Sequence, residues 1–241
     1  MSSIQIRSLR IPFRKYSNNS PTIKDLIVNP KLFLKEPDLF YAVNGVSLNI
    51  NEGERVGIIG RNGSGKSTLL KAICSIYEEY EGKIKISGRI APLLEVGAGF
   101  VPELTGLDNL YLNAGILGMS KMETKLIEEE IISFSGLSNY MNMPIKLYST
   151  GMYMRLAFSI ASAVKPDILI VDEIFAGGDF AFIKKARKRM SLLFKASKIL
   201  LMVSHDMNLI KKFCNRVIVI DKGIIKYDGT PSDAIKYYLA H

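Results

Sequence analysis

Short runs of apolar residues recur along the chain and predict buried strands, because each run ends at a polar residue or a glycine. These runs lie at residues 56–59, 168–171, 199–203 and 217–220. Residues 4–10 predict a first strand, and residues 41–50 largely alternate between apolar and polar, as a strand with one exposed face does. Residues 84–94 predict a strand pair around Gly88, and residues 224–227 complete a hairpin after a turn at 221–223.

The middle of the chain, residues 103–163, changes to the apolar spacing of helices. One helix opens at Thr105, whose hydroxyl can cap the first turn with Asp108 three residues on. A second helix is predicted over residues 121–134, and a third starts near Ser149. Because strands precede and follow this stretch, the pattern predicts an α/β core with a helical insertion.

Composition places the chain among globular proteins with a sizeable core: 241 residues, 48% hydrophobic and 23% charged. No apolar run reaches the ~18 residues that a membrane-spanning helix needs, and the first residues lack the apolar centre of a signal peptide. Cys74 and Cys214 are the only cysteines, so we expect no disulfide framework and a reducing cytosol.

The formal net charge of +9 favours an anionic partner, whether nucleic acid, a phospholipid surface or a nucleotide, although charge also serves solubility. Residues 1–36 are notably basic. Within them, apolar residues beside lysines and arginines suit an anionic lipid head group or an acidic loop of a partner, and a solvated segment explains them equally well.

One glycine-rich stretch carries the strongest chemical signal. It fits the pattern G-x-x-x-x-G-K-[ST] between a predicted strand and a predicted helix, the context of a phosphate-binding loop. Its backbone N–H groups and the helix N-terminus attract an anion, a lysine reaches the terminal phosphates and a hydroxyl ligates Mg²⁺. The predicted nucleotide contacts are Gly60, Arg61, Asn62, Gly63, Ser64, Gly65, Lys66, Ser67 and Thr68.

Two more predicted strands end in polar residues. The strand 168–171 is followed by Asp172 and Glu173, and the strand 199–203 is followed by Ser204 and His205. Ligands gather at the carboxyl ends of parallel strands, so these side chains are expected beside the phosphates. There Asp172 can hold Mg²⁺, Glu173 can deprotonate the attacking water, and His205 can contact the γ-phosphate.

A second helix N-terminus lies at residues 148–152, Tyr-Ser-Thr-Gly-Met. Ser149 or Thr150 caps the helix, and Gly151 allows a close backbone approach. From the residues alone, a second anion site and an ordinary capped helix are equally open. The basic run 184–189 could bind nucleic acid, but no aromatic residue interleaves it, so we favour a solvated helix face and expect no nucleic-acid partner.

Taken together, these motifs and their order resemble the nucleotide-binding subunit of an ABC transporter. Residues 60–68 match its Walker A loop, residues 168–173 match Walker B, and His205 matches the switch histidine. Residues 148–152 stand in the place of the family signature but depart from its usual Leu-Ser-Gly-Gly-Gln. That form, together with residues 93–106 and Gly178-Asp179-Phe180, is similar to the branch that exports polysaccharides: O-antigen, capsule and teichoic acid.

The resemblance implies a single ABC ATPase domain of the α/β class, with a P-loop NTPase (RecA-like) core that includes antiparallel β elements. The core is expected at about 1–94 and 164–241, the inserted helical subdomain at about 95–163, and an N-terminal insertion at about 14–40.

For the site, the resemblance implies ATP and Mg²⁺ as cofactors, with Glu173 and His205 as catalytic residues. Ser67 and Asp172 would hold the metal, and Glu95 is nearest in register to the family's glutamine ligand, which has no clear counterpart. The aromatic that stacks on adenine would be Phe13 or Tyr41. A second copy would contribute its signature residues in trans, and Asp179 would form the D-loop; the signature residues are Ser149, Thr150, Gly151 and Met152.

The partners implied are a second copy, sandwiching two ATP molecules head to tail, and a separate polytopic permease. The cargo would be a lipid-linked polysaccharide, O-antigen first among them, and the subunit would sit peripherally on the cytoplasmic face of the inner membrane. A nucleic-acid-associated ABC ATPase and a small-molecule kinase or GTPase are the competing readings. A kinase does not explain residues 148–152, and we find no guanine-binding motif.

Overall fold

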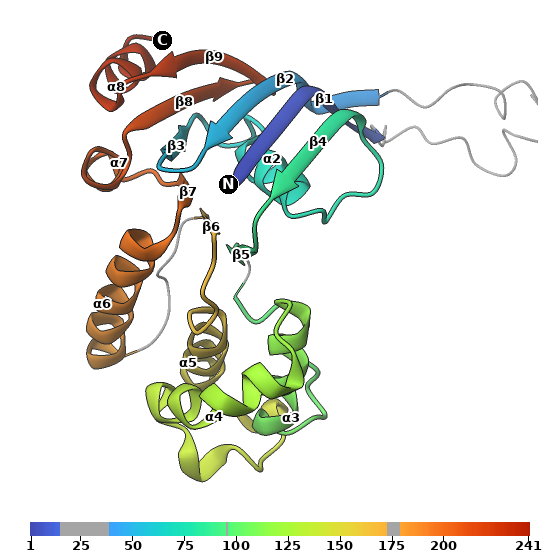
Figure 1. Cartoon of the computed structure of the whole chain (residues 1–241), viewed down its shortest axis with the longest axis vertical. Coiled ribbons are helices and arrows are strands. Elements are labelled where there is room, and N and C mark those ends of the chain that lie inside the picture. The colour runs from blue at the N-terminus through green and yellow to red at the C-terminus, as the bar shows by residue number, and fades with distance from the viewer. Residues whose placement is uncertain (15–38, 95, 173–178) are drawn as a thin grey trace, which may run out of the picture.

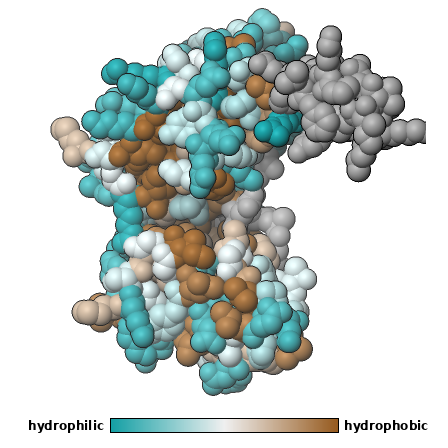
Figure 2. Space-filling view, turned by 90° about the vertical axis from the view of Figure 1, so that its right-hand side faces the viewer, coloured by the Kyte–Doolittle hydropathy of each residue, from teal (hydrophilic) through white to brown (hydrophobic). Residues whose placement is uncertain are grey.

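The computed structural model describes residues 1–14, 39–94, 96–172 and 179–241. The predictions for Glu95, for Glu173 and for most of the insertion 14–40 lie outside these residues. The described chain forms an upper lobe of two sheets and a lower lobe of three helices, coloured green to yellow in Figure 1. Figure 2 shows the same two lobes in space-filling form, with the molecule narrowing between them.

A six-stranded sheet in the order β5-β6-β7-β3-β8-β9 forms the centre of the upper lobe. Its strands are β3 (Arg55–Ile59), β5 (Ile90–Leu93), β6 (Ile168–Asp172), β7 (Ile199–Val203), β8 (Arg216–Asp221) and β9 (Ile224–Gly229). The first five run parallel, and β9 returns antiparallel to β8, so the predicted hairpin is confirmed. The buried residues of β3, β6 and β7 explain why these strands read as continuous apolar runs.

A three-stranded antiparallel sheet lies against this core, with the order β2-β1-β4. Its strands are β1 (Ser3–Arg14), β2 (Leu39–Asn51) and β4 (Glu81–Ser87). The predicted strand pair around Gly88 is wrong in one respect, because β4 pairs with β1 and β5 pairs with β6. The chain changes sheets at Gly88, where φ is +117° and a Cβ would lie 3.0 Å from Cβ of Asp167.

Helix α2 (Lys66–Ile73) packs between the two sheets, since Leu69, Leu70 and Ile73 are buried in one cluster with residues of β1, β2 and β3. The lower lobe holds α3 (Gly106–Ile116), α4 (Lys121–Ser135) and α5 (Thr150–Ala161), with short 3-10 turns η2 (Ser138–Tyr140) and η3 (Ile145–Leu147) between α4 and α5. The predicted Thr105 cap is confirmed, as its hydroxyl accepts a hydrogen bond from the Asp108 amide at 3.1 Å.

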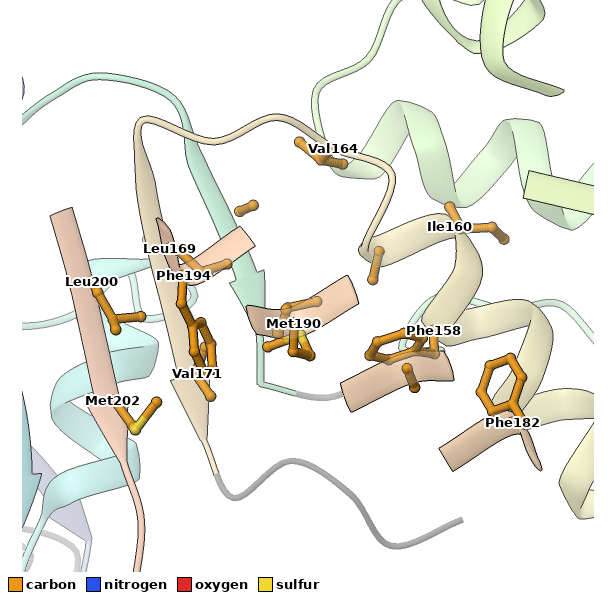
Figure 3. Packing of buried hydrophobic residues seen from close by; sticks show 14 of the residues in the cluster. Phe158, Ile160, Val164, Leu169, Val171, Phe182, Met190, Phe194, Leu200 and Met202 are labelled. Carbon is orange, nitrogen blue, oxygen red and sulfur yellow. The ribbon is translucent and has the colours of Figure 1, made fainter. Parts of the chain in front are cut away.

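The remaining helices flank the six-stranded sheet: α6 (Phe180–Ala196), α7 (Met207–Phe213) and α8 (Pro231–Ala240). Helix α6 joins the lobes, because it presents Met190 and Phe194 toward β6 and β7 and Phe182 toward Phe158 of α5 (Figure 3). The rings of Phe158 and Phe182 meet edge to face, with centroids 5.9 Å apart.

The basic run 184–189 lies on α6 and divides into two sets. Lys185 and Arg189 bridge to the lower lobe, where both cations lie over the Phe134 ring at 4.3 and 4.5 Å from its centroid. Arg189 also pairs with Glu130. The other three basic side chains of the run are solvent-exposed: Lys184, Arg187 and Lys188. Across the ranges that the structure describes, no helix is long and apolar enough to cross a membrane.

Candidate nucleotide site

A cavity of about 650 Å³ opens where the carboxyl ends of β6 and β7 meet the phosphate-binding loop and the three-stranded sheet. It brings together residues from six separate parts of the sequence, among them the glycine-rich loop, Asp172 and His205. Its lining is Phe13, Phe40, Ala42, Asn62, Gly63, Gly65, Lys66, Ser67, Thr68, Leu94, Asp172, Val203 and His205. Of the predicted loop residues, Gly60, Arg61 and Ser64 do not line it.

Gly60 and Gly65 are glycines because neighbouring backbone leaves no room for a Cβ. At Gly65, φ is +103° and a Cβ would lie 2.2 Å from the carbonyl oxygen of Ala42. At Gly60, a Cβ would lie 2.1 Å from the carbonyl oxygen of Ile220. The loop is therefore pressed against β2 on one side and β8 on the other, which turns its backbone toward the cavity.

Lys66 is 8% exposed, and its ammonium donates hydrogen bonds to the carbonyls of Gly60 and Arg61, both at 2.9 Å. These bonds close the loop around its own lysine and hold the side chain along the cavity wall. An arriving phosphate would meet this cation within the loop, where charge-assisted hydrogen bonds are short and strong.

The N-terminus of α2 suits an anion. Helices α3 to α8 of the described chain all begin with a side chain that accepts a hydrogen bond from the first turn. Helix α2 has no such cap and no acidic residue in its first turn. Its first residues, Lys66, Ser67 and Thr68, line the cavity, so a phosphate bound there can take the place of the missing cap.

Asp172 and Ser67 both line the cavity, as a shared Mg²⁺ site requires. Within the described ranges no group of three or more His, Cys, Asp or Glu side chains could hold a metal by itself. A hydroxyl and a carboxylate oxygen suit an ion that takes its other ligands from phosphate oxygens and water, the usual habit of Mg²⁺.

The aromatic end of the cavity is formed by Phe13 and Phe40, whose ring centroids lie 5.9 Å apart. Tyr77 meets Phe13 edge to face at 5.7 Å. Of the two predicted adenine partners, Phe13 lies on the cavity, whereas the Tyr41 hydroxyl hydrogen-bonds Glu81 at 3.3 Å. Sequence reasoning missed Phe40, although alternation in β2 puts Phe40 and Ala42 on the face opposite Tyr41.

Residues 149–152 lie in the lower lobe and do not line this cavity. The Ser149 hydroxyl accepts from the Met152 amide at 3.2 Å and caps α5, so the predicted Ser149 cap is confirmed. Asp179 caps α6 by accepting a hydrogen bond from the Phe182 amide at 2.9 Å. A guanidinium nitrogen of Arg155 in α5 lies 3.6 Å from the Asp179 carboxylate. The amide hydrogen bond, with help from Arg155, lowers the pKa of Asp179.

Comparison with known proteins agrees with this geometry. The sequence pattern of the family described as "ABC transporter" matches residues 43–176. The chain is 44% identical over 204 residues to "O-antigen export system ATP-binding protein RfbB" of Myxococcus xanthus, covering 85% of this chain and 47% of that protein. It is 41% identical over 225 residues to the protein of the same name from Klebsiella pneumoniae, covering 92% of each.

Among solved structures, the ATP-binding cassette MJ0796, a dimer bound to ADP and phosphate, superposes with a TM-score of 0.69 at 23% identity, covering 95% of this chain and 98% of that one. This likeness concerns the fold, which is that of an ABC ATPase cassette. With the family pattern spanning more than half of its length, the chain belongs to the ABC transporter family.

Proposed function

We propose that this chain is the ATP-binding, ATP-hydrolysing subunit of an exporter that moves lipid-linked polysaccharide, O-antigen first among the candidates, across the inner membrane. The observation that carries the proposal is the joint presence of a phosphate cavity and the polysaccharide-exporter form of residues 148–152. The Klebsiella relative supports the cargo, because the match spans 92% of both chains and that protein is named for O-antigen export.

The cavity divides the recognition of ATP between its two ends. Phe13, with Phe40 beside it, offers an aromatic face on which adenine stacks. At the other end, the backbone N–H groups of residues 63–68 and the Lys66 ammonium hold the β- and γ-phosphates. His205, which follows β7 and lines the cavity, would donate a hydrogen bond to the γ-phosphate.

A magnesium ion held by Ser67 and Asp172 would neutralise charge on the phosphates. Glu95 stands nearest to the position of the family's glutamine and is proposed as a further contact to that ion. Glu173 directly follows Asp172 in sequence, so we assign it the deprotonation of the attacking water. Water then bonds to the γ-phosphorus as the bond to the bridging oxygen breaks, which releases ADP and phosphate.

A second copy of the chain completes the site in this proposal. Ser149–Met152 and Asp179 do not line the cavity of their own chain, and the α5 N-terminus would bring its partial positive charge to the γ-phosphate of the partner. Two such sites form in a head-to-tail pair. A polytopic permease would hold this pair on the cytoplasmic face of the inner membrane, with the basic residues of 14–40 toward lipid, cargo or permease.

The proposal is tested in a strain that lacks the chain. We expect surface O-antigen to disappear and lipid-linked polymer to accumulate inside the cell, with rescue by the native chain and no rescue by Lys66→Ala. Loss of capsule or teichoic acid, with O-antigen intact, would show that the exporter carries that polymer and not O-antigen. Normal surface polysaccharides with a defect in translation or DNA repair would instead support a nucleic-acid-associated ABC ATPase.

A further inference from the structure

One segment of the lower lobe, residues 96–105, is held by hydrogen bonds to the helices beneath it; we call it the strap. Two buried asparagines of α3 carry much of this attachment. Asn109 accepts from the Val101 amide at 2.7 Å and donates to the carbonyls of Val101, Leu104 and Thr105. Asn113 donates to the Ala98 carbonyl at 2.7 Å. Such satisfied buried polar networks fix one arrangement of the backbone.

Tyr153, in the first turn of α5, contacts the strap at its beginning. Its hydroxyl donates to the Gly97 carbonyl at 2.9 Å, and its ring meets Phe100 edge to face with centroids 5.0 Å apart. Gly97 has φ of +90°, and a Cβ there would lie 2.7 Å from the Tyr153 ring. The tyrosine therefore lies directly on the strap backbone, an approach that only glycine permits.

These contacts connect the rim of the nucleotide cavity to residues 149–152 at the start of α5. The strap starts two residues after Leu94, which lines the nucleotide cavity next to the end of β6. Tyr153 follows residues 149–152 directly, and its own amide donates to the Ser149 carbonyl at 2.9 Å in the first helical bond of α5. A displacement at the cavity rim would thus reach the first turn of α5 through the Tyr153 side chain.

We propose that Tyr153 is a positioning residue that couples the rim of the nucleotide cavity, through Gly97 and Phe100, to the N-terminus of α5. In this role it sets where Ser149–Met152 is presented to the cavity of a second copy. The inference rests on the proposed function, because it concerns how that site closes. Tyr153 does not line the nucleotide cavity, so its effect is on how residues 149–152 are presented to a second copy.

Hydrogen exchange of the intact chain, with and without ATP and Mg²⁺, tests the coupling without requiring turnover. In the native chain, nucleotide should slow exchange at residues 63–68, at 96–100 and at the first turn of α5. Tyr153→Phe keeps the ring and loses one hydrogen bond, so the response of the α5 turn should fall by about two- to tenfold, and kcat by a similar factor. The responses of residues 63–68 and the Kd for ATP should stay unchanged.

Tyr111→Phe is the matched control. Its hydroxyl hydrogen-bonds Glu128 between α3 and α4 in the same lobe, so the variant loses an equivalent group that makes no hydrogen bond to Gly97 or to α5. An α5 turn that responds alike in native chain and Tyr153→Phe would overturn the proposal, as would an equal loss in Tyr111→Phe. A native chain in which residues 63–68 respond and the α5 turn does not also contradicts it. No response at residues 63–68 would instead count against nucleotide binding itself.

Discussion

Replacing Gly65 with alanine should damage the phosphate-binding loop in two ways that can be estimated from the structure. The residue has φ of +103°, and a non-glycine residue in the left-handed region costs about 1–2 kcal/mol. The added Cβ would lie 2.2 Å from the Ala42 carbonyl oxygen, well inside van der Waals contact, so β2 or the loop must shift. Overpacking of this kind costs about 1–3 kcal/mol, which brings the expected loss of stability to about 2–5 kcal/mol.

Gly63→Ala is the matched comparison, because Gly63 lies in the same loop with φ of +75° and has open space where the alanine Cβ would stand. Its free energy of unfolding should fall only by the cost of the left-handed backbone conformation, about 1–2 kcal/mol. Urea unfolding of both variants measures the difference. In Gly65→Ala the shifted loop should also lose at least one N–H contact to phosphate, which lowers ATP affinity by roughly 10- to 100-fold in a titration.

The reasoning fails if both variants unfold at the same urea concentration with the same slope. Equal destabilisation would mean that the contact with Ala42 relaxes without cost, and that the loop is not held in place by β2. A stable Gly65→Ala variant that still loses ATP binding would separate the two effects and refute the link between packing and affinity.

Three further substitutions probe the separate parts of the site. Lys66→Ala should lower ATP affinity at least about tenfold by equilibrium titration, because the buried ammonium is lost, and unchanged affinity would contradict the phosphate assignment. Glu173→Gln should keep ATP binding, reduce phosphate release by about 10²–10⁴-fold and accumulate an ATP-bound dimer in light scattering, whereas normal turnover would move the catalytic role elsewhere. Gly151→Asp should bind ATP and fail to hydrolyse it, since a carboxylate then faces the partner's γ-phosphate, and mixing it with Lys66→Ala should restore part of the activity through one intact hybrid site.

The continuous apolar runs predicted the strands of the central sheet, because a strand that is buried on both faces is apolar at nearly every position. The phosphate-binding loop could also be identified from the sequence, since its glycines, lysine and hydroxyl are required by the chemistry of one ligand. Asp172 and His205 line the same cavity as this loop, because the carboxyl ends of parallel strands share one edge of a sheet.

Other features depend on contacts between distant parts of the chain and could not be predicted from local sequence patterns. The two strands around Gly88 were identified, but which sheet each joins depends on tertiary packing that alternation does not reveal. Phe40 was missed because the alternation was taken to begin at residue 41, whereas β2 begins at Leu39. Tyr153 and Gly97 are 56 positions apart in the sequence, so no local sequence pattern predicts their contact.

ATP-driven movement of the cargo tests the central claim most directly. The chain would be reconstituted with its permease in lipid vesicles that carry labelled lipid-linked O-antigen polysaccharide on the face where the chain binds. We predict that ATP and Mg²⁺ deliver the polymer to the opposite face, and that Lys66→Ala abolishes delivery. Phosphate release by the native chain with no delivery of polymer, or equal delivery by Lys66→Ala, would contradict the account.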